Sequence, residues 1–163
     1  MKQPTWFIAL RTTIVGALFT VFWIVAMLFV RRFAVDVPLP SWLSPFGILL
    51  AAAGGALSFS CAAVFTARGR GTPAPFDPPR EFVTSGPYRF CRNPMALGFC
   101  IMLAGLALCL HSALGLALAA FVFLLGHVMV VAWEERHLRT TFGDAYVDYC
   151  RRVPRWIPAL KVR

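Results

Sequence analysis

Four apolar stretches separated by more polar segments dominate the pattern of this chain. They cover residues 12–30, 46–67, 95–110 and 113–133. Because a helix needs about 20 apolar residues to cross a bilayer, three of the stretches are long enough to span one. The third stretch, taken as a helix, extends only about 24 Å against a hydrocarbon core of about 30 Å. We therefore predict an all-α polytopic membrane protein with about four transmembrane helices and a single domain, residues 1–163.

The third and fourth stretches form one apolar unit with charged ends. Between Pro94 and Glu134 the chain has no Lys, Arg, Asp or Glu. Because very few residues join the two stretches, they are predicted to form an antiparallel helical hairpin. A hairpin returns both of its ends to the same membrane surface, so Arg92 is expected to lie near Glu134 and Glu135. Gly98 is one of several small residues expected to allow close packing of the two hairpin helices.

The segment after Trp133 continues with helical periodicity. One apolar stripe recurs at spacings of three and four residues: Leu138, Phe142, Tyr146, Tyr149 and Val153. This spacing predicts a single cytoplasmic amphipathic helix, lying on the membrane or on the preceding loop and ended by Pro154 and Pro158.

The connection 68–94 is the only long loop between the apolar stretches. Five prolines between Pro73 and Pro87 exclude a regular helix there. Apolar side chains nevertheless recur along it, which predicts an ordered loop packed at the cytoplasmic interface. These anchors are Phe76, Phe82, Val83, Tyr88 and Phe90.

Composition and charge agree with a membrane protein and indicate its orientation. The chain is 59% hydrophobic with a mean hydropathy of +0.70, which excludes an ordinary soluble domain. The net charge is +9, and Arg31 and Arg32 are the only cations expected on one side of the membrane. The positive-inside rule then places both termini and the long loop in the cytoplasm, in contact with anionic lipid. Because the arginines flank apolar spans, nucleic-acid binding is excluded, and the Ala, Arg and Leu content favours a bacterial inner membrane.

The five cysteines include no CxxC pair. Those inside the apolar stretches act as small apolar residues, and the loops lie in a reducing compartment. We therefore predict no disulfide and no metal site.

Polar residues near the ends of the hairpin are the candidates for chemistry. His127 lies seven residues before Glu134, two turns and about 10 Å along the same helix face. The pair predicts a polar cavity open to the cytoplasm, although His127 could instead bond a neighbouring helix. Arg92 precedes Asn93-Pro94 at a helix start, which favours a carboxylate or phosphate. With Glu134 holding an ammonium group, these residues match the amino-acid end of S-adenosylmethionine.

Several motifs carry a family resemblance. They are Gly86-Pro87-Tyr88-Arg89, Arg92-Asn93-Pro94 with Gly98, Glu134-Glu135, the run 142–146, and Arg152-Val153-Pro154-Arg155. In order and spacing the chain resembles the membrane methyltransferases typified by isoprenylcysteine carboxyl methyltransferase, with phospholipid N-methyltransferases as relatives. The resemblance implies that S-adenosylmethionine binds between the hairpin and the C-terminal segment. Its binding residues would be Arg92, Asn93, Pro94, Gly98 and Glu134.

The chain departs from the family pattern at two positions. Asn93 stands where the family usually has histidine, and Ala96 where tyrosine is common. The second change affects how the cofactor pocket is closed.

The implied reaction moves a methyl group from a sulfonium to a lipophilic acceptor and needs no metal. Arg152 matches a family arginine near the acceptor and could orient a carboxylate. For an amine or thiol acceptor, Glu135, His137 or His127 could remove a proton. An NADPH-dependent membrane reductase of related architecture and a non-catalytic membrane subunit remain alternatives, which binding of S-adenosylmethionine would separate from the methyltransferase.

Overall fold

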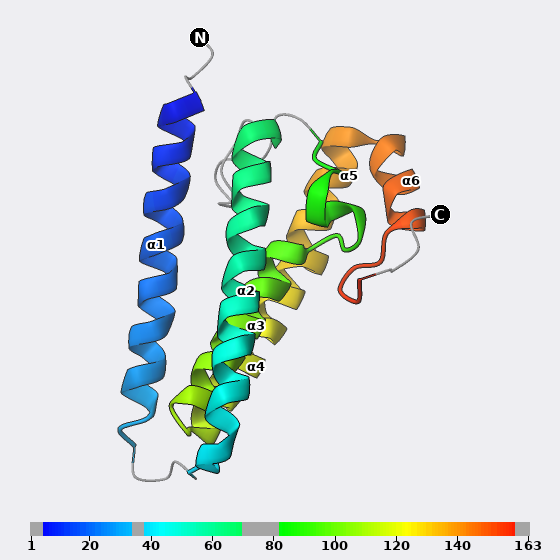
Figure 1. Ribbon diagram of the computed structural model, residues 1–163. Coiled ribbons are helices and arrows are strands. Elements are labelled where there is room, and N and C mark those ends of the chain that lie inside the picture. The colour runs from blue at the N-terminus through cyan, green and yellow to red at the C-terminus, as the bar shows by residue number, and fades with distance from the viewer. Residues whose placement is uncertain (1–4, 34–37, 70–81, 159–163) are drawn as a thin grey trace.

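The computed structural model describes residues 5–33, 38–69 and 82–158, and these are almost wholly helical (Figure 1). The helices are α1 (Thr5–Val30), α2 (Ser44–Val64), α3 (Pro94–Cys109), α4 (Ala113–Met129), α5 (Glu135–Phe142) and α6 (Asp144–Arg152). Two π-helical segments extend α2 and α4, Phe65–Gly69 and Val130–Glu134. Within the described residues the only β-type pairing is an isolated bridge between Pro38 and Ser112.

In the described part of the chain, three helical segments are long and apolar enough to cross a membrane: Trp6–Val30, Ser41–Ala67 and Ala113–Phe142. The predicted all-helical membrane fold is confirmed. Helix α3 has 16 residues and is as short as the sequence suggested. The count of four spans stays a prediction. Helix α1 begins at Thr5, before the predicted start, because Arg11 is a good helix former and continues the helix.

Helices α2 and α3 pack closely because glycine residues, which have no side chain, lie at their contact. A Cβ on Gly54 would lie 2.4 Å from the backbone nitrogen of Met102, and one on Gly105 would lie 2.4 Å from that of Ala51. Gly98 faces the same way, since a Cβ there would lie 2.8 Å from the carbonyl oxygen of Gly54. The expectation that Gly98 serves the packing of α3 on α4 was therefore wrong, because its missing side chain makes room for α2.

Helices α3 and α4 form the predicted antiparallel hairpin. They share a core of Leu103, Ala107, Ala119 and Val122, which Met27 of α1 completes. The turn includes His111 in a left-handed conformation, with φ of 54°. The hairpin returns the chain to the end of the molecule that carries the start of α1 and α6 (Figure 1). The charged residues that flank the hairpin, Arg92 and Glu135, are thereby brought together.

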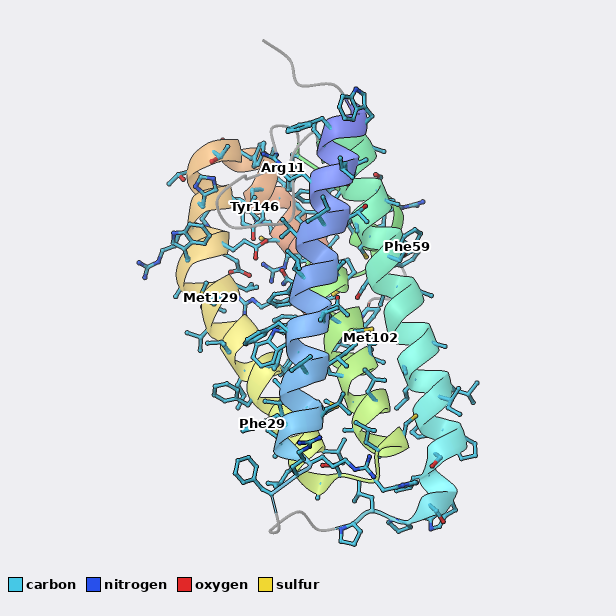
Figure 2. All side chains as sticks on the ribbon, turned by 90° about the vertical axis from the view of Figure 1, so that its left-hand side faces the viewer. Arg11, Phe29, Phe59, Met102, Met129 and Tyr146 are labelled. Atoms are coloured by element: carbon cyan, nitrogen blue, oxygen red, sulfur yellow. The ribbon has the colours of Figure 1, made fainter. Side chains whose placement is uncertain are left out.

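Helix α1 packs on the side of this bundle and leaves much of its own surface exposed. Its large apolar side chains Leu18, Phe22 and Phe29 are exposed, as expected of residues that face lipid tails. Figure 2 shows Arg11 of α1 at the end that carries Tyr146, and Phe29 near the opposite end.

Beyond α4 the chain forms two helices in place of the single one predicted. Gly143 separates α5 from α6 with φ of 54°, a conformation that a glycine adopts without strain. The apolar stripe still packs on the loop, because the Phe82 ring lies 5.1 Å from that of Phe142 and 5.2 Å from that of Tyr149.

The loop before α3 is ordered over its described part. Val83 and Tyr88 are buried as predicted, together with Cys61 of α2. Phe90 was wrongly expected to be an anchor, since its side chain is exposed. Phe76 lies outside the described residues. The packed loop fixes the residues that begin α3.

Candidate functional site

The C-terminal strap, residues 153–158, returns to the base of the hairpin and is fastened there by hydrogen bonds. The backbone N–H of Arg92 donates to the carbonyl of Pro154 at 2.9 Å. The Asn93 amide donates to the carbonyl of Arg155 at 3.1 Å. The Cys91 thiol lies 3.3 Å from the carbonyl oxygens of both Arg155 and Trp156. The strap therefore packs against the loop that begins α3.

A buried carboxylate lies between this strap and the hairpin. Arg155 donates to both oxygens of Glu135, from Nε at 2.7 Å and from Nη2 at 3.0 Å. Arg92 adds a third bond, from Nη1 at 3.0 Å. We call Arg92, Glu135 and Arg155 the arginine–carboxylate cluster. Because a buried unpaired carboxylate is strongly destabilising, the two guanidinium groups explain why Glu135 is tolerated there.

The surroundings of the strap keep the Cys91 thiol and the Tyr149 hydroxyl protonated and the Arg155 guanidinium charged. The hydrogen bond to Glu135 raises the pKa of Arg155. Burial raises the pKa of Tyr149, whose hydroxyl donates to the carbonyl of Tyr88 at 2.7 Å. Burial likewise raises the pKa of the Cys91 thiol. Both groups consequently keep their protons and hold the loop and the strap together.

The start of α3 has unused donors. Asn93 is the N-cap residue, yet its side chain makes no capping bond and bonds the strap instead. Pro94 follows at the first helical position, where its lack of an N–H costs nothing. The Nε atom of Arg92 is buried without a partner among the described residues. This arrangement suits an anionic group, since helix N-termini and guanidinium groups both favour negative charge.

Glu134 and Glu135 are adjacent but differ in environment. Glu135 is buried in the cluster, whereas the side chain of Glu134 is exposed. Glu134 ends the π-helical segment Val130–Glu134, a feature that is frequent at functional sites. Among the described residues, no hydrogen bond or ion pair engages Glu134. Its carboxylate is therefore available to a ligand.

His127 is bound by the strap. The indole N–H of Trp156 donates to its Nδ1 atom at 2.9 Å. The Trp156 ring also packs on Phe123, with ring centroids 4.9 Å apart. The sequence offered a hydrogen bond from His127 to a neighbouring helix as an alternative; the partner is instead Trp156 of the strap, which follows the last helix.

The structure brings together most of the predicted site residues. Arg92, Asn93 and Glu135 meet at the strap, and His127 joins them through Trp156, while Pro94 follows Asn93 as the first residue of α3. Gly98 does not face the strap, because it packs on α2.

Arg152 is also outside the cluster. It is exposed on α6, where its Nε bonds the carbonyl of Asp148 at 3.3 Å in its own helix. Arg155 occupies the position beside Glu135 that sequence reasoning did not assign. Its signal was the last arginine of the motif Arg152-Val153-Pro154-Arg155, which lies just after the proline that ends the helix. The described residues contain no group of three or more His, Cys, Asp or Glu placed to hold a metal ion.

A known protein family contains the part of the chain that forms the hairpin of this site. The model of the family described as phospholipid methyltransferase matches residues 43–145, which include α2, the hairpin and both glutamates. The chain belongs to the phospholipid methyltransferase family. The resemblance to membrane methyltransferases of the isoprenylcysteine carboxyl type is thereby confirmed.

Individual relatives of this family member come from bacteria and plants. Protein-S-isoprenylcysteine O-methyltransferase B of Arabidopsis thaliana is 31% identical over 72% of this chain and 60% of its own length. Cobalt-zinc-cadmium resistance protein CzcN of Cupriavidus metallidurans is 29% identical over 75% of this chain and 54% of its own length. This phospholipid methyltransferase family member thus spans about half the length of the curated relatives it matches.

The fold is shared with a solved membrane enzyme. The structure of the eukaryotic intramembrane Ras methyltransferase ICMT superposes with a TM-score of 0.59 and 22% identity. The match covers 72% of this family member and 42% of the solved chain. At that identity the likeness establishes the membrane fold alone.

Proposed function

We propose that this protein transfers a methyl group from S-adenosylmethionine to a lipophilic acceptor at the cytoplasmic face of the membrane. One observation carries the proposal. In a member of a methyltransferase family, Arg92, the uncapped start of α3 and the available carboxylate of Glu134 lie at one end of the hairpin. These groups have the charges that a zwitterionic amino-acid moiety requires.

The residues fit the amino-acid end of the cofactor. The unpartnered Nε of Arg92 and the first N–H groups of α3 would hold its carboxylate. Glu134, which no described cation pairs, would hold its ammonium group. Asn93 and Pro94 would set the start of α3. Gly98 would act indirectly, because its contact with α2 fixes where α3 begins.

When bound, the cofactor would supply an activated methyl group on a sulfonium, so the protein's task is alignment and exclusion of water. The arginine–carboxylate cluster would hold the strap against the hairpin during the reaction. Glu135 is not proposed as a base, because both of its oxygens bind Arg155. Arg155 is a positioning residue in this scheme.

The acceptor would enter from the bilayer. Helix α4 exposes Phe121, Leu124 and Val128 next to His127, and such side chains are compatible with lipid. The Arabidopsis relative is named for O-methylation of isoprenylcysteine, a lipidated group. Both points support a lipophilic acceptor for this chain.

The orientation follows from charge. The described part of α1 begins at the end that also carries α5 and α6 (Figure 1), whereas Arg31 and Arg32 follow the opposite end of α1. By the positive-inside rule this charge pattern supports a site at the cytoplasmic face of the membrane, which a soluble cofactor would reach. For a bacterial chain this membrane is the inner membrane.

Calorimetry on the detergent-purified protein tests the proposal. We expect S-adenosylmethionine and S-adenosylhomocysteine to bind, and Glu134→Gln to weaken both by about 10- to 100-fold, the equivalent of losing about 1.5–3 kcal/mol in a charged hydrogen bond. Asp148→Asn is the matched control, because the Asp148 side chain is exposed and, among the described residues, its ion pair is with Arg151. No cofactor binding by the folded wild type would overturn the proposal, and binding of NADPH instead would favour the reductase.

A further inference from the structure

The bond between Trp156 and His127 determines which ring nitrogen of the histidine carries the proton. An indole N–H can only donate a hydrogen bond. The Nδ1 atom of His127, 2.9 Å from the indole nitrogen, must therefore present a lone pair. A neutral imidazole with a lone pair on Nδ1 has its proton on Nε2.

The Nε2–H group is left available to a ligand. Among the described residues, the His127 side chain makes one hydrogen bond, which it accepts at Nδ1 from Trp156. The ring is half-buried, so Nε2 is not sealed within the core. A polar donor on an apolar membrane helix is costly unless it meets a partner, which makes such a residue a candidate for ligand binding.

The strap binds both His127 and the arginine–carboxylate cluster. Trp156 and Arg155 are consecutive in the strap, and they bind His127 and Glu135 respectively. His127 precedes Glu135 by eight residues, or about 12 Å along the helix toward the middle of the membrane. The histidine thus lies on the membrane side of the charged cluster, where the lipophilic acceptor approaches.

We propose that His127, with its tautomer set by Trp156, donates a hydrogen bond from Nε2 to the methyl acceptor and selects an oxygen or sulfur acceptor over an amine. This inference rests on the proposed methyl transfer and names its acceptor class. His127 is then a binding residue for the acceptor and does not serve as a base, because the lone pair on Nδ1 is already occupied by Trp156 and Nε2 carries the proton.

The selection follows from counting lone pairs. In the transfer, a lone pair of the acceptor forms a bond to the methyl carbon while the carbon–sulfonium bond breaks and its electron pair stays on sulfur, leaving a neutral thioether. A carboxylate or thiolate has further lone pairs that can accept from Nε2–H during the attack. A neutral amine has one, so accepting from His127 would occupy the pair that must attack. An alkylammonium would first have to lose a proton to solvent, and an alkanethiol would have to do the same to react as its thiolate; the two differ in the lone pairs that remain for Nε2–H.

Two substitutions of the same residue separate this role from a structural one. Asn places an amide oxygen near the position of Nδ1 and keeps the acceptor for Trp156, but it lacks a donor at the reach of Nε2. Gln reaches the Nε2 position with an N–H and gives up the bond to Trp156. We expect His127→Gln to retain most of kcat/KM for the acceptor and His127→Asn to lose about tenfold or more, with cofactor affinity unchanged in both. The opposite order would show that His127 only fastens the strap.

Three acceptors of equal chain length test the selection. Purified protein is incubated with methyl-labelled S-adenosylmethionine and decanoate, decanethiol or decylamine. We expect label in decanoate, decanethiol or both, and none in decylamine. Label in decylamine, or in none of the three while the cofactor binds, would overturn the assigned class.

The tautomer can be observed without turnover. In protein labelled with ¹⁵N-histidine, the His127 signals, assigned with His127→Asn, should show an unprotonated Nδ1 and a protonated Nε2. Trp156→Phe should release this preference. A proton on Nδ1 in the wild type would overturn the inference even if methyl transfer is demonstrated. Failure of the wild type to bind cofactor would instead remove the proposed function.

Discussion

Arg155 binds Glu135 through two parallel hydrogen bonds, from Nε at 2.7 Å and from Nη2 at 3.0 Å. This geometry is available to arginine and not to lysine, whose ammonium is a single point of charge. Because Glu135 follows α4 and Arg155 lies in the strap, the pair joins the hairpin to the C-terminal segment. The pair therefore adds a charged connection to the bonds that Asn93 and His127 make with the same strap.

Removal of this connection should destabilise the protein. Arg155→Ala leaves the buried Glu135 with one partner and is expected to lower the free energy of unfolding by about 1.5–3 kcal/mol, the usual range for hydrogen bonds to charged groups. Denaturant titration in detergent, followed by circular dichroism, measures the change. Arg151→Ala is the control, since its ion pair with Asp148 is exposed and should contribute at most about 1 kcal/mol. Equal effects of the two variants would contradict the role given to Arg155.

Glycine at the α2–α3 contact should be irreplaceable. A Cβ on Gly54 would meet the backbone of Met102 at 2.4 Å and that of Gly98 at 2.5 Å, so Gly54→Ala must separate the two helices. We expect the free energy of unfolding to fall by about 1–3 kcal/mol, as at other overpacked sites, in the same titration. Gly16→Ala, at a position with nothing within 4 Å of the added carbon, should cost nothing. A neutral Gly54→Ala would mean that this close approach is absent.

The hydroxyl of Tyr149 should contribute to the stability of the protein in addition to the packing of its ring. Tyr149→Phe keeps the packing on Phe82 but leaves the buried carbonyl of Tyr88 without its 2.7 Å donor. A loss of about 1–3 kcal/mol is expected from an unsatisfied buried acceptor. Unchanged unfolding of the Phe variant would show that the loop before α3 does not depend on this bond.

Cys91 should react slowly and only at high pH. Burial raises its pKa, so the reactive thiolate forms above the ordinary range near 8.5. Labelling by maleimide at pH 8 should be slow in the folded protein and should accelerate as the pH rises further. Mass spectrometry of the peptide that contains Cys91 gives the rate, with the same peptide from protein unfolded in detergent as the reference. Equal rates at pH 8 in the folded and unfolded protein would contradict the packing of Cys91 under the strap.

The sequence predicted the hairpin and its charged base because their signals are local. An apolar run without charge from Met95 to Trp133 can form few structures in a membrane, and its short turn forces the two helices to be antiparallel. The nearness of Arg92 to Glu135 follows from that topology alone. The stripe from Leu138 to Val153 likewise predicted a helix packed on the membrane or on the loop, and the structure packs it on the loop, although Gly143 divides the helix.

Other features depend on contacts that no local pattern encodes. Gly98 is a small residue on α3, and only the structure shows that it faces α2 and not α4. Arg152 and Arg155 belong to one motif, but the extended backbone at Val153 ends α6 between them and sends only Arg155 to Glu135. The bond from Trp156 to His127 joins residues 29 positions apart, so its partner could not be assigned from periodicity.

Transfer of a tritiated methyl group tests the central claim most directly. The purified protein is reconstituted with lipid from bacterial membranes and supplied with S-adenosylmethionine labelled in the methyl group, and the label is followed into material extracted by organic solvent. The account predicts enzyme-dependent label in the lipophilic fraction, reduced by about tenfold or more in Glu134→Gln under subsaturating cofactor. Label confined to the aqueous phase, or an equal yield from wild type and Glu134→Gln, would contradict it.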